Sequence, residues 1–424
     1  MPSPELLVSL LLVGLSETSS AAVRQVDLAE ALNLAFARNR SLAVVRADVA
    51  RVQAAVTQAR AGWLPTLNAN ASLVWLDADR QIADRVITAQ ETLQANLQLQ
   101  VPLVAARAWL ESARAAEAVE VAQANERERR RAIGLLTARV YLGVVQERQA
   151  LAIAERAVQT SRAALVLAVR RKEAGAGTRL EEARAERELQ DNLSRLESAW
   201  VRVAAGREAL GAVTAEDGPL DASVLPELEP GPGLAEALAG LEDRPDLATQ
   251  VARRTLAEKR AGDAWGDYLP TLMGVVTPLL QTPPTPTVPS PALQAQLLLS
   301  FPIFDGGLRY ARQAEREALL SAAEATLEEA RLSARSELRT SYQVVEHRAQ
   351  ARVSAEAAAT LAEETLRLVR RTFEEGSGTQ LELIDAERAA RDAATSAVLA
   401  AIAEKSAMID LLAAAGRFPA EVAP

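Results

Sequence analysis

Closely spaced acidic side chains are the residues of this chain whose types and spacing could do chemistry. Glu382 and Asp385 are three residues apart, which places both on one face of a helix. Neighbouring carboxylates can form catalytic dyads, but pairs such as Glu328-Glu329 and Glu181-Glu182 are more simply solvated helix faces. We therefore expect these carboxylates to act through their negative charge and not as catalytic acids or bases.

The composition excludes most reaction chemistry. The chain has no cysteine, which removes thiolate nucleophiles, disulfides, cysteine-ligated metals and an N-terminal lipidated cysteine. The single histidine, His347, is surrounded by polar residues of an expected helix, and no phosphate-loop or dinucleotide motif is present. The net charge of −9 argues against a nucleic-acid partner. We expect no enzyme, no cofactor and no metal site.

The sequence contains an internal repeat with a period of about 200 residues. Leu28-Ala29-Glu30-Ala31-Leu32 recurs as Leu234-Ala235-Glu236-Ala237-Leu238, and Leu64-Pro65-Thr66-Leu67 recurs as Leu269-Pro270-Thr271-Leu272. The glycine-containing segment Gly175-Ala176-Gly177-Thr178 recurs as Gly376-Ser377-Gly378-Thr379. Such matches in the same order predict an internal two-fold structural repeat.

Long helices are expected in both halves, from about Ala105 to Lys172 and from Leu308 to Glu375. Neither range contains proline, and apolar residues recur at intervals of seven, which is typical of coiled coils. The glycines after each helix permit a tight reversal into a returning helix. Shorter helices are expected near Leu28–Ala37 and Ser41–Gly62, and at the equivalent places of the second half. On the helices alone, a coiled-coil spacer would explain the chain.

Alternating segments change this interpretation. From Leu93 to Val101, apolar residues alternate strictly with uncharged polar residues, so one face of a strand would be apolar and the other hydrophilic. Nine residues fit a tilted membrane strand. We expect strands at about 66–76, 92–102, 271–280 and 292–302; the third is the weakest, and Pro278 should cut it short. The loops 76–90 and 281–291 should be hairpin tips facing the cell exterior.

A membrane interpretation requires several chains. An open sheet edge cannot persist in lipid, and membrane barrels begin at about eight strands. Four strands per chain would give eight in a dimer, with a lumen filled by side chains, or twelve in a trimer, with an aqueous lumen. The strands alone do not choose between these.

The N-terminus resembles a secretory signal peptide, with the apolar run Leu6–Leu15 before small residues and cleavage near Ala22. It lacks the usual basic residue and carries Glu5, so an unstructured N-terminus or a different start stays open. The expected organisation is a signal peptide (1–22), a first repeat (23–217), a linker (218–233), a second repeat (234–416) and a C-terminal tail (417–424).

At this point the chain resembles the outer-membrane efflux protein family. The resemblance rests on the junctions Leu64-Pro65 and Leu269-Pro270, on Phe301-Pro302-Ile303-Phe304-Asp305-Gly306-Gly307, and on the segment 376–386. The first half departs from it, because its strand exit after Val101-Pro102 lacks Asp-Gly-Gly.

The resemblance implies a mainly α protein with a small β part. Each chain would contribute coiled-coil hairpins to a long α-helical barrel and four membrane strands to a twelve-stranded β-barrel, closed as a homotrimer. It implies an outer-membrane location, contact with outer-membrane lipid, a periplasmic helical part, and work in a tripartite efflux or type I secretion system. The partners would be a periplasmic adaptor protein and an inner-membrane pump of RND or ABC type. The helix from Ser41 would stack end to end with the helix after Thr178.

The resemblance also assigns roles at the helix-hairpin tips. Glu382 and Asp385 match acidic rings at the periplasmic entrance, which favour cations. Glu181 and Arg184 hold the equivalent places of the first half, where ion pairs could keep the gate closed, or where they are ordinary surface charges. The turns would dock the adaptor through these residues: Gly175, Gly177, Thr178, Gly376, Gly378 and Thr379. The main alternative is a soluble periplasmic coiled-coil scaffold or adaptor, which leaves the alternation of 93–101 unexplained.

Overall fold

The computed structural model describes residues 23–83, 85–228, 231–286 and 288–419. The expected signal peptide at 1–22 lies outside these residues. The chain divides into two compact units. One consists of residues 44–128 and 245–333, and the other consists of the remaining segments. Each unit therefore contains parts of both sequence repeats.

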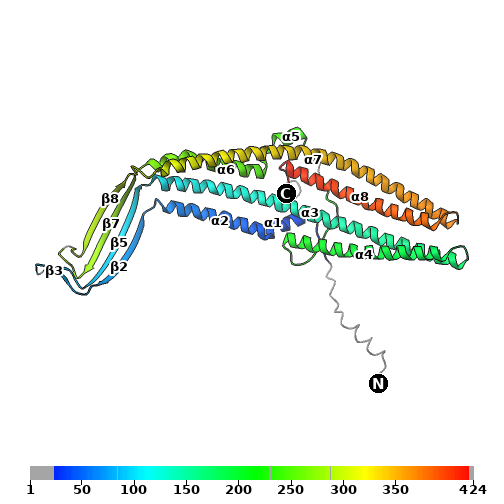
Figure 1. Cartoon of the computed structure of the whole chain (residues 1–424), viewed down its shortest axis with the longest axis horizontal. Helices are drawn as coiled ribbons and strands as arrows, with labels where there is room; N and C mark the ends of the chain where they lie inside the picture. Colours follow the sequence, from blue (N-terminus) through cyan, green and yellow to red (C-terminus); the bar gives the residue numbers. More distant parts are fainter. Residues whose placement is uncertain (1–22, 84, 229–230, 287, 420–424) are drawn as a thin grey trace, which may run out of the picture. The chain divides into compact units, whose positions relative to one another are not determined.

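The first of these units contains a four-stranded antiparallel sheet in the order β2-β5-β7-β8 (Figure 1). The strands are β2 (Thr66–Trp75), β5 (Glu91–Val104), β7 (Thr271–Thr282) and β8 (Ala292–Ser300). Strands β5 and β7 come from different halves of the sequence, so their pairing joins the repeats in one sheet. Strands β2 and β8 are its edges.

The strand register matches apolar residues with apolar residues. Leu67 is opposite Leu99 and Leu73 is opposite Leu93, while Asn70 is opposite Asn96 on the other face. The Asn70 side chain donates to the Asn96 side chain over 3.1 Å. Because side chains alternate along a strand, this register gathers an apolar face and an uncharged polar face.

Two expectations about this sheet are wrong. Pro278 does not end β7, which continues to Thr282. Pairing of β7 with β5 skips Thr277 and Pro278 in the described register, whereas Pro278 is opposite Leu293 of β8. A proline is tolerated there because the missing N–H falls on the interrupted side. The expected loop at 76–90 also holds a small hairpin, β3 (Arg80–Ile82) with β4 (Arg85–Thr88).

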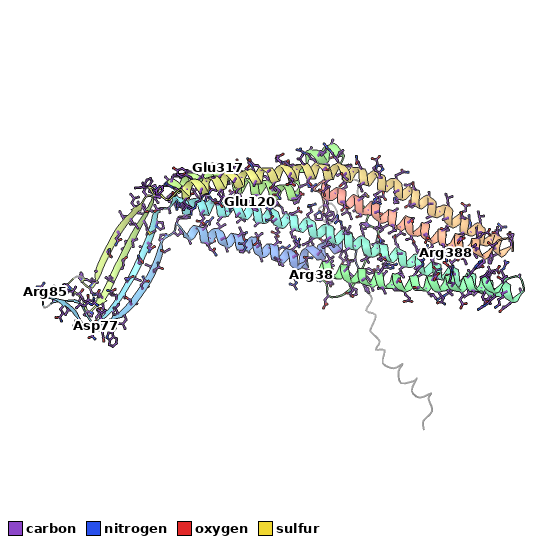
Figure 2. The ribbon with its side chains drawn as sticks, in the orientation of Figure 1. Arg38, Asp77, Arg85, Glu120, Glu317 and Arg388 are labelled. Atoms are coloured by element: carbon purple, nitrogen blue, oxygen red, sulfur yellow. The ribbon has the colours of Figure 1, made fainter. Side chains whose placement is uncertain are left out.

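The same unit carries the helical segments that adjoin the sheet. They are α2 (Arg40–Ala61) from Val44 onward, α6 (Pro245–Gly262), the 3-10 helix η3 (Asp263–Tyr268) and the sheet-proximal parts of α3 (Ala106–Glu173) and α7 (Leu308–Glu374). The start of helix α7 is capped by the Asp305 side chain, which accepts the backbone N–H of Gly307 (3.2 Å) and of Arg309 (3.2 Å). Asp77 and Arg85 lie at the end of the sheet away from these helices (Figure 2).

The second unit contains the remaining parts of α3 and α7 and their returning helices, α4 (Arg179–Thr214) and α8 (Gln380–Ala414). It also contains α1 (Leu28–Arg38), α5 (Leu234–Ala239), the 3-10 helix η2 (Leu241–Asp243) and the parallel strands β1 (Arg24–Gln25) and β6 (Leu220–Asp221). The Asn39 side chain donates to the carbonyl of Val213 over 2.9 Å, so the start of α2 is held at the end of α4.

The main core lies in this second unit, around α1 and the middle of α3. Leu32, Tyr141 and Leu210 are fully buried there. Two expected connecting segments contribute to it: Leu220 of the linker is buried in β6, and Phe418 of the C-terminal tail is 2% exposed. Both segments are therefore packed structure in their described parts.

Candidate functional site at the helix-hairpin tips

The two hairpin turns share one local structure. Thr178 and Thr379 precede α4 and α8, and each hydroxyl accepts the backbone N–H three residues on, from Glu181 (3.2 Å) and Glu382 (3.3 Å). Each glutamate accepts the threonine N–H in return, over 3.0 and 2.8 Å. These capping boxes satisfy two helix-end donors at each tip and begin both returning helices sharply.

The glycines are required by this geometry. Gly175 and Gly376 have φ of +75° and +81°, a left-handed conformation that disfavours other residues. At Gly177 and Gly378, an added Cβ would lie 3.0 Å from the backbone nitrogens of Lys172 and Phe373. Paired glycines therefore permit both the reversal and the close approach of the chain to the preceding helix.

The second tip presents its predicted acidic residues at the surface. Glu382 and Asp385 are both exposed. The hydrogen bonds from the Thr379 backbone and side chain lower the pKa of Glu382 below its ordinary value. Glu382 is therefore ionised at neutral pH, while one of its oxygens is engaged in the cap.

The first tip is charged differently. Arg184 is half-buried and forms no ion pair within the described chain. The carboxylate engaged there is that of Glu182, which contacts Lys172 at 2.6 Å and Arg179 at 2.5 Å. The hydrogen bond from Lys172, followed by that from Arg179, lowers the pKa of Glu182.

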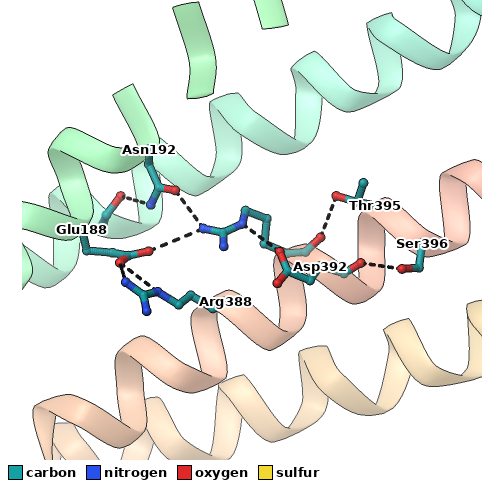
Figure 3. A network of polar contacts seen from close by, with 8 residues as sticks. Glu188, Asn192, Arg388, Asp392, Thr395 and Ser396 are labelled. Atoms are coloured by element: carbon teal, nitrogen blue, oxygen red, sulfur yellow. Dashed lines mark hydrogen bonds and ion pairs between the residues drawn. The ribbon is translucent and has the colours of Figure 1, made fainter. Parts of the chain in front are cut away.

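A polar cluster further along the hairpins was not expected from the sequence (Figure 3). Glu188 of α4, with a side chain only 3% exposed, accepts from Arg388 Nε of α8 at 3.0 Å. Arg391 of α8 lies 3.5 Å from Glu188 and donates to Asn192 Oδ1 at 2.9 Å. Asn192 in turn donates to Ser161 Oγ of α3 at 3.0 Å. The cluster therefore ties the two hairpins of one chain together.

Electrostatics explain why Glu188 stays charged. Burial alone would raise its pKa, but the hydrogen bond and charge of Arg388 and the charge of Arg391 outweigh it and lower the pKa below its ordinary value. Sequence analysis missed this cluster because its charges look like the solvated faces around them. Their partners lie about 200 residues away, and no local pattern marks them.

Glu387 is a second buried acid beside this cluster. Its side chain is 9% exposed, Arg370 Nη2 lies 3.7 Å away, and Oε1 has no hydrogen-bond partner in the described part of the chain. Burial raises the pKa of Glu387 to about 7 against the opposing charges of Arg370 and Arg391, with the nearby Glu188 adding to the increase. This carboxyl is thus poised to change charge near neutral pH.

The described residues contain no cluster of acidic or histidine side chains that could hold a metal ion. None of their helices combines the length and the apolar character that crossing a membrane requires.

Comparisons with known proteins identify the class. Residues 31–216 and 239–417 match the outer membrane efflux protein family, and the chain belongs to this family. No curated protein sequence matches the chain. The match to the family confirms the location in the outer membrane and the role in efflux, both of which were expected from the sequence.

Solved structures share the fold. A membrane protein from Pseudomonas aeruginosa aligns with a TM-score of 0.81 at 21% identity, over 93% of this chain and 91% of that one. The open-state MtrE outer membrane channel of Neisseria gonorrhoeae aligns with a TM-score of 0.78 at 22% identity, over 94% and 93%. The CmeC outer membrane channel of Campylobacter jejuni aligns with a TM-score of 0.80 at 15% identity, over 92% and 85%.

Proposed function

We propose that three copies of this chain form an outer-membrane export duct. The observation that carries the proposal is the four-stranded sheet with two open edges, β2 and β8. All residues of β2 and nearly all of β8 are exposed in the single chain, including Leu67 and Leu297 on the apolar face. Neighbouring chains would pair these edges and lipid would cover the apolar face.

Three chains are favoured over two because an export duct needs a water-filled lumen. Four strands from each of three chains give a twelve-stranded barrel, which leaves room for water, whereas eight strands enclose only side chains. The uncharged polar face of the sheet, with Asn70, Asn96 and Gln98, would line this lumen. Such a lining suits cargo of varied chemistry.

The partners are those expected of a passive duct. We propose a periplasmic adaptor and an inner-membrane pump of RND or ABC type, because an open channel supplies no energy of its own. Exposed leucines support docking at the tips: Leu180 and Leu381, 58% and 51% exposed, follow the two capping threonines at equivalent places. The proposed docking surface comprises these leucines and the turn residues Gly175, Gly177, Thr178, Gly376, Gly378 and Thr379.

The proposed gate is the acidic tip of the second hairpin. Three copies each of Glu382 and Asp385 would concentrate negative charge in one constriction and favour cations. Glu181 and Arg184 would face them from the first hairpin. The exposed positions of Glu382 and Asp385 and the depressed pKa of Glu382 support this proposal.

The deciding experiment is the native mass of the protein extracted in detergent from isolated outer membranes. We expect a mass near three times that of the chain, 45.3 kDa before any signal-peptide cleavage. One or two chains per particle, recovered without detergent, would remove the barrel and favour the soluble scaffold.

A further inference from the structure

A cavity of about 430 Å³ lies among the helix ends that adjoin the sheet. It is lined by segments of α3, α6, η3 and α7, all within the unit that contains the sheet. Its charged lining consists of four arginines and three acidic residues: Arg107, Arg114, Arg260, Arg316, Glu111, Asp263 and Asp267.

Ion pairs leave this cavity with excess positive charge. Asp267 contacts both Arg107 Nε at 3.1 Å and Arg316 Nη2 at 2.8 Å. Asp263 contacts Arg114 Nε at 3.1 Å. Three guanidinium groups therefore share these two carboxylates, and with Glu111 and Arg260 the lining holds four positive and three negative charges, an excess of one positive charge. Arg260 is exposed and forms no ion pair within the described chain.

One arginine of the cavity lining carries a donor without an acceptor. Arg316 is only 16% exposed, and its Nη1 is buried without a hydrogen-bond partner among the residues that the structure describes. A buried donor left unpaired costs free energy, and a charged donor costs more. Guanidinium groups fit the oxygens of a phosphate in geometry as well as in charge. The missing acceptor is therefore best supplied by a phosphate group.

The position of the cavity indicates where the phosphate comes from. Arg107 follows the end of β5 at Val104 by three residues, and Asp267 precedes the start of β7 at Thr271 by four. Exposed Trp109 and Trp265 flank the same helix ends. Tryptophan is enriched where membranes meet water, at the depth of lipid headgroups. In other membrane proteins, basic pockets between membrane-spanning segments bind anionic lipid headgroups.

We propose that this arginine-lined cavity is a phosphate-binding site, occupied by the headgroup of an anionic phospholipid in the inner leaflet of the outer membrane. Arg316 and Arg260 provide the free donors, while Asp263 and Asp267 hold Arg107 and Arg114 in place. Soluble phosphate is the other source of the same chemistry.

Two measurements on the protein purified in detergent test the site. Calorimetric titration with inorganic phosphate at constant ionic strength measures the shared chemistry. Native mass spectrometry with added phosphatidylglycerol, compared with uncharged diacylglycerol, measures retention of the lipid. We expect Arg260→Gln and Arg316→Gln each to weaken phosphate binding about tenfold and to abolish selective lipid retention.

The matched control is Arg312→Gln, one turn from Arg316 on α7 and outside the cavity lining. Arg260→Gln should fold normally even if Arg316→Gln does not, because the Arg260 side chain is exposed and its removal breaks no ion pair of the described chain. Phosphate binding without lipid retention would assign the site to soluble phosphate. The proposal is overturned if neither phosphate nor phosphatidylglycerol binds the native protein, or if Arg312→Gln weakens binding as much as the cavity variants.

Discussion

Glu188 and Arg388 lie 200 residues apart in the sequence and form a buried ion pair that joins the returning helices of the two hairpins. The pair is extended by Arg391 and Asn192, so that α4, α8 and α3 are linked through polar side chains. Because Glu188 is almost fully buried, removal of its charge leaves cations without their partner.

Glu188→Gln should loosen the contact between α4 and α8. We expect a loss of about 1–3 kcal/mol of local stability, because a hydrogen-bonded charge pair is replaced by a neutral contact. Hydrogen exchange of the backbone amides of α4 and α8 measures this loss of local stability. Glu186→Gln, exposed on the same helix, is the control. Equal exchange in wild type and Glu188→Gln would mean that the apolar contacts alone hold the hairpins together.

Glu387 should make the hairpin contact sensitive to pH. Its folded pKa, about 7, lies above the ordinary 4.5, so the folded state binds more protons than the unfolded state between these values. Stability therefore falls as the pH rises from about 4.5 to about 7 and stays level above. Hydrogen exchange of α8 at about pH 5 and about pH 8, corrected for intrinsic rates, measures this slope. Glu387→Gln should remove it, and a slope retained in this variant would assign it to another group.

The acidic tip should determine ion preference. Glu382→Gln combined with Asp385→Asn should lower the cation preference in single-channel recordings, because two charges per chain are lost from the constriction. Glutamine still serves in a capping box, so the helix start is preserved. Asp392→Asn, exposed further along α8, is the control. Unchanged selectivity in the double variant would remove the gate assignment and leave the fold intact.

The tip glycines should be sensitive to substitution. Gly376→Ala forces a side chain into a left-handed conformation and should cost about 1–2 kcal/mol. Gly378→Ala also brings a Cβ within 3.0 Å of the Phe373 nitrogen and should disturb the turn itself. Gly143→Ala, in the interior of α3 with no side chain or neighbouring element within 4 Å of its added Cβ, should not destabilise the protein and should stabilise the helix by up to about 1 kcal/mol. Thermal unfolding compares the three, and equal effects would contradict the turn geometry.

The two faces of β5 should respond oppositely to charge. Leu97→Arg places a cation on the apolar face and should cost about 2–4 kcal/mol in the membrane. Gln98→Arg, the next residue, points to the polar face and should be tolerated. The amount of assembled protein in isolated outer membranes measures both. Equal assembly of the two variants would mean that the apolar face does not contact lipid.

Local chemistry made much of this fold predictable. The alternation from Leu93 to Val101 determines which side chains share a face, because neighbouring residues of a strand point to opposite sides. The glycines before Thr178 and Thr379 locate the hairpin turns, since glycine alone enters the left-handed region freely. In these cases the cause lies within a few residues of its effect.

The tertiary structure decided what depends on distant residues. It paired β5 with β7, continued β7 through Pro278 by placing the missing N–H on an interrupted side, and buried Phe418 of the expected tail in the core. The same holds for Glu188 and Arg388. Each reads as a solvated charge in its own helix, and only the packing of α4 against α8 excludes water from the pair and makes it a link between the two halves.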